Sequence, residues 1–379
     1  MPSRKRPWDR RHPGAGPGGF PGYLRGALAV AAALGGLTTM AAGCGAGAPA
    51  AGGSSPGPGW VVPGAAPGPD GRVQGLRPCG PPEAIGRVRD EAVTETSGLI
   101  RSRHHGDLLW LHNDSGDVAR LFAVDPAGGT RGVTLLPQTP AFDWEGMARG
   151  PLRPNGPEGL FVADFGDNHH ERPFIVIERL AEPGLGGTAA APRVGDEPDH
   201  LRFTYGDGRR HDAEALIVDR PSGDLYVLTK EFEDRPGIFH AEAPHPASRG
   251  LLGRRPAPPR VLEQVGEVAL PPDAGSHLVT DAALSDAGDG VLVRTYEDVF
   301  FFTRRSGEPL EAALDRPPVS WPAPEERQGE AITFVADPPG YATISEGVHP
   351  TIWRVRLCPS GGEPEDGLAD TPDQVADDV

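Results

Sequence analysis

The chain has 379 residues and a formal net charge of −17 at pH 7, which is enough length for one large domain or two ordinary ones. This excess of acid excludes a nucleic-acid partner, because nucleic-acid binding needs a basic surface. It also argues against direct attraction to an anionic membrane surface. The 53 Gly and 44 Pro are densest in residues 45–69 and near the C-terminus, so the region between them is the part expected to fold.

The N-terminus is organised as a secretory signal peptide. A lead with six basic residues precedes an uncharged, mostly apolar run over residues 27–42, which is too short for a comfortable transmembrane helix. The small residues Ala41, Ala42 and Gly43 stand directly before Cys44, as a lipoprotein peptidase requires. The sequence therefore predicts a lipid on Cys44 and a place on the extracytoplasmic side of the cell membrane. An uncleaved anchor helix and an ordinary cleavage site are the alternatives, and Arg10-Arg11 leaves the choice between Sec and Tat export open.

The sequence predicts that the whole chain divides into four parts. We expect a signal peptide over 1–43, a Gly/Pro/Ala-rich tether over 44–78, a folded region over 79–358 and an acidic disordered tail over 359–379. Removing residues 1–43 takes away six basic residues and one acid, so the net charge falls from −17 to −22. Only Cys79 and Cys358 then remain besides Cys44. Outside the cytoplasm such a pair favours a disulfide over two unrelated thiols.

The central region contains five repeats, which begin near residues 95, 143, 212, 280 and 328. Each has an acidic residue, a short apolar strand, a turn, a second strand that ends in polar residues, and a third strand. The strands are rich in β-branched and aromatic residues and are bounded by Gly, Pro, Asp and Asn. Because no helical period interrupts them, the repeats predict an all-β fold, a β-propeller of five blades. A six-bladed propeller is the second choice and a β-sandwich the third.

A propeller must close its ring, because its terminal blades would otherwise expose strand edges. The fifth repeat offers only three strands before Cys358. We expect residues 86–93 to supply the missing outer strand, antiparallel to residues 351–357. That arrangement brings the N-terminal strand's beginning near the end of the fifth repeat, so the predicted closure and the predicted Cys79–Cys358 disulfide agree.

The inner strands of a propeller run parallel along the channel, so their starts and the ends of the second strands share one face. Glu95, Glu145, Glu214, Asp281 and Glu330 occupy the same position in our alignment of the repeats. The predicted metal or ligand set on this face comprises Glu95, Asp143, Glu145, Asp212, Glu214, Asp281, Glu330, Asn113, Asp114, Asp167 and Asn168. Oxygen ligands of this kind suit Ca²⁺, whereas the alternative is that each acid holds backbone N–H groups. Lys230 and Arg294 are the candidates for anion binding.

Several whole phrases resemble a group of secreted bacterial β-propeller proteins. They begin at Leu109 (LWLHNDSGD), Asp143 (DWEGMA), Val162 (VADFGDN) and Asp212 (DAEAL). The group is similar to phytase-like and esterase-like propellers and, more loosely, to regucalcin-like propellers. The resemblance covers residues 79–358 and implies a propeller and, as one activity, a calcium-dependent hydrolase. The chain departs from those enzymes in its blade count and in lacking a dense run of Lys and Arg for phosphate.

Two functions from different classes follow. The first is a membrane-anchored lipoprotein whose acidic face binds an unknown small molecule or protein partner without catalysis, since a fold does not confer catalysis by itself. The second is a calcium-dependent phosphoesterase or esterase in which Glu145, Glu214 and Glu330 hold the ion that polarises the scissile group.

Overall fold

In the computed structural model, residues 71–232, 235–247 and 258–360 are described, and they belong to one compact unit. The predicted signal peptide, Cys44, residues 45–70 of the predicted tether and residues 361–379 of the predicted tail lie outside them. The described part is almost entirely β-structure, with one short helix, α1 (Leu310–Leu314). Within it, no helix has the length and apolar character needed to cross a membrane.

The strands form four hydrogen-bonded sheets. One holds β3 (Thr96–Arg101), β4 (Leu109–Asn113), β5 (Arg120–Val124), β6 (Thr130–Leu135) and β10 (Arg193–Val194). The largest holds β7 (Trp144–Pro151), β8 (Glu158–Asp164), β9 (Ile175–Leu180), β11 (Asp199–Tyr205), β12 (Ala213–Val218), β13 (Leu225–Thr229), β14 (Gly237–Ala241) and β15 (Arg260–Glu267). The third holds β16 (Val279–Leu284), β17 (Gly290–Thr295), β18 (Val299–Thr303) and β19 (Val319–Trp321). The last holds β1 (Leu76–Pro78), β2 (Glu83–Arg87), β20 (Gly329–Ala336), β21 (Pro339–Ser345) and β22 (Thr351–Pro359).

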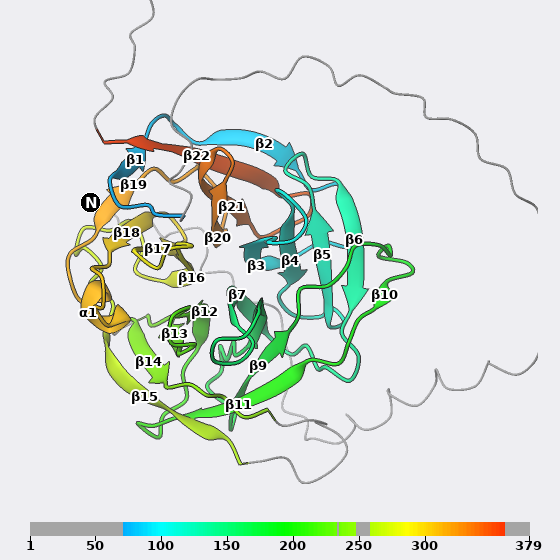
Figure 1. The fold of residues 1–379 in the computed structure, drawn as a ribbon, viewed down its shortest axis with the longest axis horizontal. Helices are drawn as coiled ribbons and strands as arrows, with labels where there is room; N and C mark the ends of the chain where they lie inside the picture. Colours follow the sequence, from blue (N-terminus) through cyan, green and yellow to red (C-terminus); the bar gives the residue numbers. More distant parts are fainter. Residues whose placement is uncertain (1–70, 233–234, 248–257, 361–379) are drawn as a thin grey trace, which may run out of the picture. The chain divides into compact units, whose positions relative to one another are not determined.

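Each sequence repeat forms one antiparallel unit. The eight-stranded sheet contains two of them, which are joined where β11 and β15 run parallel. The inner strands β3, β7, β12, β16 and β20 contact one another in that order, and β20 contacts β3, so the ring is closed (Figure 1). The predicted all-β propeller is confirmed. The blade count stays a prediction, because two units share one continuous sheet.

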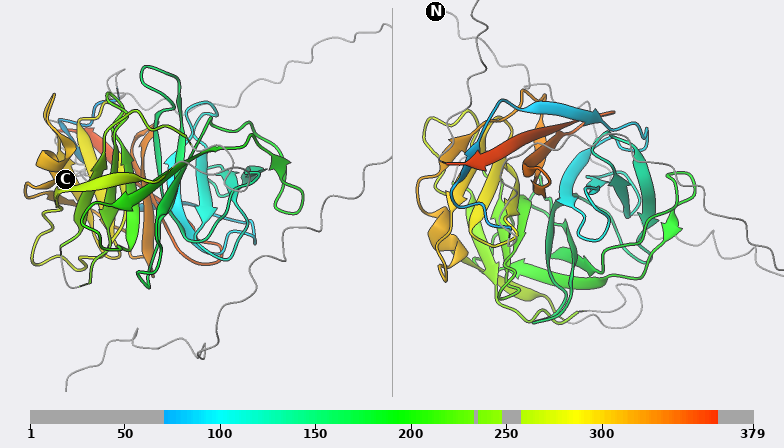
Figure 2. Two further views of the ribbon diagram at one scale, coloured as in Figure 1. Left: turned by 90° about the horizontal axis from the view of Figure 1, so that it is seen from below. Right: turned by 45° about the horizontal axis from the view of Figure 1, so that its top comes forward.

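The core lies between the units. Five clusters of buried apolar side chains each combine residues from two neighbouring units. Phe161 and Phe239 belong to one cluster, and Leu99 and Ile344 belong to the cluster where the two ends of the chain meet. The sheets therefore stand face to face around the ring, as the edge-on view in Figure 2 lets the reader follow. Strands covered on both faces need apolar residues at successive positions, which explains the fully buried runs of β4 and β13.

The ring closes through β22, which pairs with both N-terminal strands. Its beginning pairs with β2 and its end with β1, both antiparallel. The Cys79–Cys358 disulfide joins the two ends, with the Cα atoms 5.6 Å apart, which confirms the predicted pairing. The outer strand spans 83–87 rather than the expected 86–93. The chain turns after Arg87 because the Asp90 carboxylate accepts hydrogen bonds from the Ala92 N–H and the Thr130 hydroxyl, both at 3.1 Å.

Removing the disulfide is expected to destabilise the fold without changing its shape. The bond joins residues that are 279 positions apart in the sequence. A disulfide that closes a long loop of this kind contributes about 2–5 kcal/mol to the free energy of unfolding. A C79S/C358S double variant should unfold at lower denaturant concentration, as followed by circular dichroism. An unchanged unfolding midpoint would show that the β1–β22 and β2–β22 pairing closes the ring unaided.

Near the C-terminal ends of the inner strands, four arginines surround one aspartate. Arg101, Arg149 and Arg220 come from three different units and approach the Asp286 carboxylate at 2.6, 2.5 and 2.8 Å, and Arg103 approaches it at 3.3 Å. We call these five residues the arginine mouth. Burial opposes ionisation of Asp286, but the positive charges of Arg220, Arg149 and Arg101 outweigh it and lower the pKa of Asp286 to about 2. One carboxylate thus holds side chains from the first three units against the fourth.

Replacing this carboxylate by an amide should leave the arginines with uncompensated charge. We expect D286N to lose about 3–5 kcal/mol of unfolding free energy, the usual cost of breaking a buried ion pair from one side. Because the folded-state pKa is lowered, the wild-type stabilisation is present above the ordinary pKa of 3.8 and disappears as the pH falls toward 2. Denaturant unfolding at pH 7, 4 and 2 tests both statements. E267Q is the matched control, because the Glu267–Arg235 pair is exposed and 4.0 Å apart. A D286N midpoint equal to that of E267Q would contradict the assignment.

Candidate functional site

Every inner strand begins with an irregularity in its pairing. The register with the second strand shifts just after Thr96, Trp144, Ala213, Val279 and Gly329. Such bulges turn side chains away from the regular alternation and are frequent beside functional sites. Here they place the polar side chains of each repeat at the start of the channel.

The bulges correct our alignment of the acids. Thr96 in β3 pairs with Asn113 as Trp144 in β7 pairs with Asp164, so Glu95 corresponds to Asp143 rather than to Glu145. The position equivalent to Glu145 is taken by Ser97. Our alignment of the sequence repeats paired residues because both were acidic. In the structure, equivalent residues are those that hold the same place relative to the bulge.

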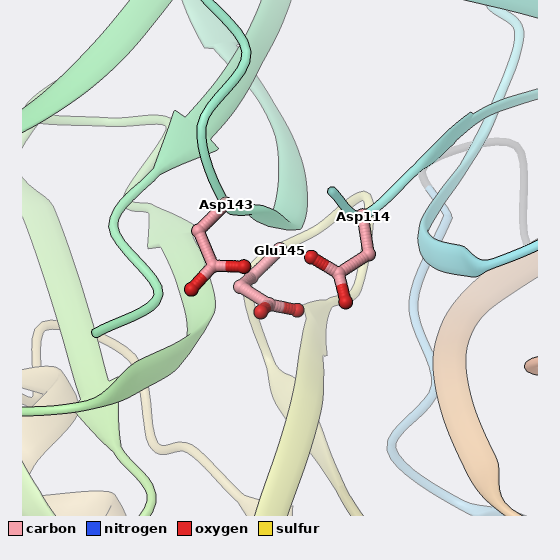
Figure 3. A group of neighbouring side chains, drawn as sticks. All are labelled: Asp114, Asp143 and Glu145. Carbon is pink, nitrogen blue, oxygen red and sulfur yellow. The ribbon is translucent and has the colours of Figure 1, made fainter. Parts of the chain in front are cut away.

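Three carboxylates meet at this end of the channel. Asp114, Asp143 and Glu145 each offer an oxygen atom, and these atoms all lie within 4.8 Å of one another. Figure 3 shows the three side chains pointing toward one another from the β4–β5 loop and from the start of β7. Glu145 is buried, and Asp114 and Asp143 are half-buried. We call this set the carboxylate triad.

Further charged groups stand behind the triad. Glu145 accepts a hydrogen bond from the Ser97 hydroxyl, and the neighbouring Glu214 forms a buried ion pair with the Lys230 ammonium group. Burial, followed by the charge of Glu214, raises the pKa of Glu330 to about 8, and burial raises that of Glu214 to about 7 against the opposing effect of Lys230. We call the triad with Glu214, Lys230 and Glu330 the acidic mouth.

The three carboxylates of the triad repel one another because they lie close together. Burial, followed by the hydrogen bond and the charge of Asp143, raises the pKa of Asp114 to about 9. Burial, followed by the charges of Glu214 and Asp114, raises the pKa of Glu145 well above its usual range. Carboxylates held in this way bind either a proton or a cation, because both remove the repulsion.

The surroundings of the triad fit a small hard cation. Asp114 Oδ1 is buried without a hydrogen-bond partner, and so is Oδ2 of Asp212, a residue with 2% exposed surface. A side chain at Gly166 would fill the space, since its Cβ would lie 2.6 Å from Asp143 Oδ2 and 2.8 Å from Glu145 Oε1. The donors are all oxygen atoms, the ligand type of Ca²⁺.

Three of the predicted ligand residues accept hydrogen bonds from backbone N–H groups with their side chains. Asp281 is fully buried and accepts from the Ala282 and Ile332 N–H groups at 2.8 and 2.9 Å. The Asn113 side-chain oxygen accepts from the Thr94 and Glu95 N–H groups. The Asp167 carboxylate accepts from two N–H groups in the β8–β9 loop, each at 2.8 Å. These contacts are the structural alternative that the repeat pattern left open.

The other predicted ligands lie around the triad. Asp212 accepts from the Asp167 N–H at 2.8 Å, and burial raises its pKa. Glu330 accepts from the Gln328 amide at 2.6 Å. Glu95 is half-buried, and its carbonyl accepts from the Asp114 N–H at 2.7 Å. Asn168 is exposed on the β8–β9 loop.

The two predicted anion-binding residues have internal partners. Lys230 pairs with Glu214, and Arg294 is fully buried and pairs with Glu326 at 2.8 Å. Arg294 fits only because residue 329 is glycine, where a Cβ would lie 1.8 Å from its Nη2 atom. A cleft of about 600 Å³ lies beside Lys230, and Asp212, Arg209 and Arg210 also line it. Their role toward an anion stays a prediction.

Sequence reasoning missed Ser97 and Gly166, which both contact the triad. Ser97 had a signal, because it stands two residues after Glu95 as Glu145 stands two residues after Asp143. Gly166 lies in the phrase VADFGDN, but nothing local says that two carboxylates approach it. The arginine mouth was missed as well, because its members lie near or just after the ends of the inner strands and share no repeated motif.

Asp281 tests the division between structural and ligand-binding acids. D281A should lose about 2–4 kcal/mol of unfolding free energy, because two buried N–H groups are left without an acceptor. Its affinity for divalent cations should equal that of the wild type in calorimetry, provided that the variant is measured while folded. A tenfold loss of cation affinity would move Asp281 from the structural group into the site.

No family model matches the sequence, and no curated protein matches it. Among solved structures, a glutaminyl cyclase from Myxococcus xanthus is similar, with 11% identity, a TM-score of 0.41, and coverage of 73% of this chain and 96% of that chain. A glucose dehydrogenase gives 11% identity, a TM-score of 0.36, and coverage of 73% and 99%. A second glucose dehydrogenase gives 10% identity, a TM-score of 0.37, and the same coverage. No activity is transferred from these proteins to this chain.

Proposed function

We propose that this protein is an extracytoplasmic lipoprotein, anchored through Cys44, whose acidic mouth binds Ca²⁺ and through it a ligand outside the cell membrane. The observation that supports the cation site is the carboxylate triad, in which one oxygen atom of each residue lies within 4.8 Å of the other two. In addition, the buried Oδ1 atom of Asp114 has no hydrogen-bond partner. The predicted signal peptide and the small residues before Cys44 support the anchor.

Calcium suits this arrangement better than the transition metals. Carboxylate and carbonyl oxygens are the ligands of hard cations, whereas transition metals prefer imidazole or thiolate. The Nδ1 atom of the nearby His112 contacts the Asn113 carbonyl at 3.0 Å, and its Nε2 atom has no hydrogen-bond partner, but neither nitrogen belongs to the cluster of ligand atoms that the triad forms. Ca²⁺ also accepts irregular geometry and completes its six to eight ligands with water or with a bound molecule. A coordinated ion open to the channel mouth thereby becomes the attachment point for a ligand's oxygen atoms.

A second candidate, a calcium-dependent hydrolase, rests on the cleft beside Lys230. Arg209 and Arg210 line this cleft next to Asp212, so an anionic substrate placed there would lie beside the cation. In that case the ion would polarise the scissile group. The described residues give no nucleophile with an adjoining base in this cleft, so we rank binding first.

The cation proposal is tested by titrating the purified protein with calcium chloride in a calorimeter and in thermal melts. We expect binding with a rise in melting temperature, because a ligand that binds only the folded state stabilises it. D143N/E145Q should weaken binding at least tenfold, since two of three charged ligands are lost. E171Q is the control, because Glu171 is exposed on the β8–β9 loop and its loss should leave the affinity unchanged.

The same preparations separate the two candidate functions. Assays with p-nitrophenyl phosphate and p-nitrophenyl acetate should show no calcium-dependent turnover if the protein only binds. Turnover that disappears in D143N/E145Q would replace the binding function by the hydrolase. No heat of binding and no thermal shift at millimolar calcium would refute the cation site.

A further inference from the structure

The described chain begins at the arginine mouth. Gly71 lies so close to Asp286 that a Cβ on it would be 2.5 Å from the Asp286 Cβ, and its carbonyl accepts from the Ala287 N–H at 3.3 Å. The next residues are tied to the same turn, because the Val73 and Gln74 N–H groups donate to the Asp289 carboxylate at 3.1 and 3.0 Å. The described chain therefore enters the propeller at this mouth.

The arginine mouth is a basic spot on an acidic protein. Its four arginines form ion pairs with two carboxylates, those of Asp286 and Glu158, and the contacts to Glu158 are long, at 3.4 to 3.9 Å. A third carboxylate, that of Glu182, accepts a hydrogen bond from the Arg103 N–H at 3.0 Å, so the arginines still outnumber the acids. Arg103 keeps 49% of its side chain exposed. Arg72 is also exposed, and it lines a small cavity together with Arg101 and Asp286. The negative net charge of the whole chain gives no sign of this local excess of arginines over carboxylates.

The two mouths lie at opposite ends of the channel. The triad stands where β7 begins, and Arg149 stands where the same strand ends. Arg101 likewise closes β3, whose first residues adjoin the triad through Ser97. Strands of this length place their ends about 20 Å apart. A surface that meets the arginine mouth therefore leaves the acidic mouth on the far side.

We propose that the arginine mouth docks on anionic phospholipid headgroups, so that the acidic mouth faces away from the membrane. This rests on the proposed anchor at Cys44. Residues 45–70 separate Cys44 from Gly71, so the lipid and the arginine mouth can lie no farther apart than about 90 Å, the reach of a fully extended chain of that length. The anchor thus keeps the basic surface at high local concentration near the headgroups, where arginines attract acidic lipid. The net charge of −17 opposes such contact elsewhere on the surface and so favours this one orientation.

The orientation is tested with one fluorophore at either mouth. H104C places a thiol on the exposed β3–β4 turn beside Arg103, and V118C places one on the β4–β5 loop at the acidic mouth, where Val118 is 56% exposed. The labelled, lipidated full chain is incorporated into vesicles of phosphatidylcholine with about one third phosphatidylglycerol that carry a headgroup quencher. We expect at least threefold stronger quenching of the label at 104. Equal quenching, or stronger quenching at 118, would overturn the proposal.

Charge is tested separately from tether position. In vesicles of phosphatidylcholine only, and in R72Q/R103Q, the difference between the two labels should disappear, whereas the control R209Q, an exposed arginine of the cleft at the other mouth, should keep it. A difference that persists in neutral vesicles would overturn docking by charge. Addition of free phosphate at millimolar concentration should not abolish it, and abolition would assign the site to phosphate instead of lipid.

The anchor has its own readout. C44A should abolish flotation of the chain with vesicles, and unchanged flotation would refute the lipoprotein. In that event the chain from residue 44 onward, held on chelating lipid by an N-terminal histidine tag, gives the same two-label comparison, so the docking proposal stands or falls independently.

Discussion

Closure of the ring is the constraint on which the rest of the structure depends. The five inner strands contact one another in a circle, and this circle exists only because β22 pairs with β2 from the other end of the chain. Without that pairing, β22 of the fifth unit would present an open strand edge, and the cluster that contains Leu99 and Ile344 would lose one of its two sides. The acidic mouth has the same dependence, because Asp114 and Glu330 come from the two units that the closure brings together.

The ring also places acidic and basic side chains at opposite ends of the channel. Parallel inner strands carry all their starts to one end of the channel and all their ends to the other, so the acids gather at the first and the arginines at the second. At the arginine mouth the opposite charges are mixed and Asp286 is strongly acidic. At the acidic mouth like charges dominate, and the pKa of Asp114 rises to about 9. At the arginine mouth, internal carboxylates offset part of the positive charge, whereas at the acidic mouth a cation from outside would offset the repulsion between the carboxylates.

The sequence predicted what depends on repetition and failed where single residues decide. Short strands between turn residues revealed the propeller, and two cysteines at the ends of the repeats revealed the disulfide that is present. The convergence of Asp114, Asp143 and Glu145 followed from the parallel direction of the inner strands. The bulges could not be read, because each depends on hydrogen bonds to the second strand, and Glu95 was therefore aligned two residues away from its true counterpart. Arg294 was similarly read as open to a ligand, whereas the absence of a side chain at Gly329 lets it sink beside Glu326.

The position of the disulfide has a mechanical consequence. A pull on the N-terminal side of Gly71 first loads the contacts with Asp289 and then the β1–β22 pairing, after which the chain reaches Cys79. There the tension passes through a covalent bond to Cys358 and along the backbone of β22, instead of peeling β2 from the ring. Residues 71–78 can thus be stripped under force while the closure beyond them stays intact. A protein held to a surface by one end would keep its channel in shape under shear flow.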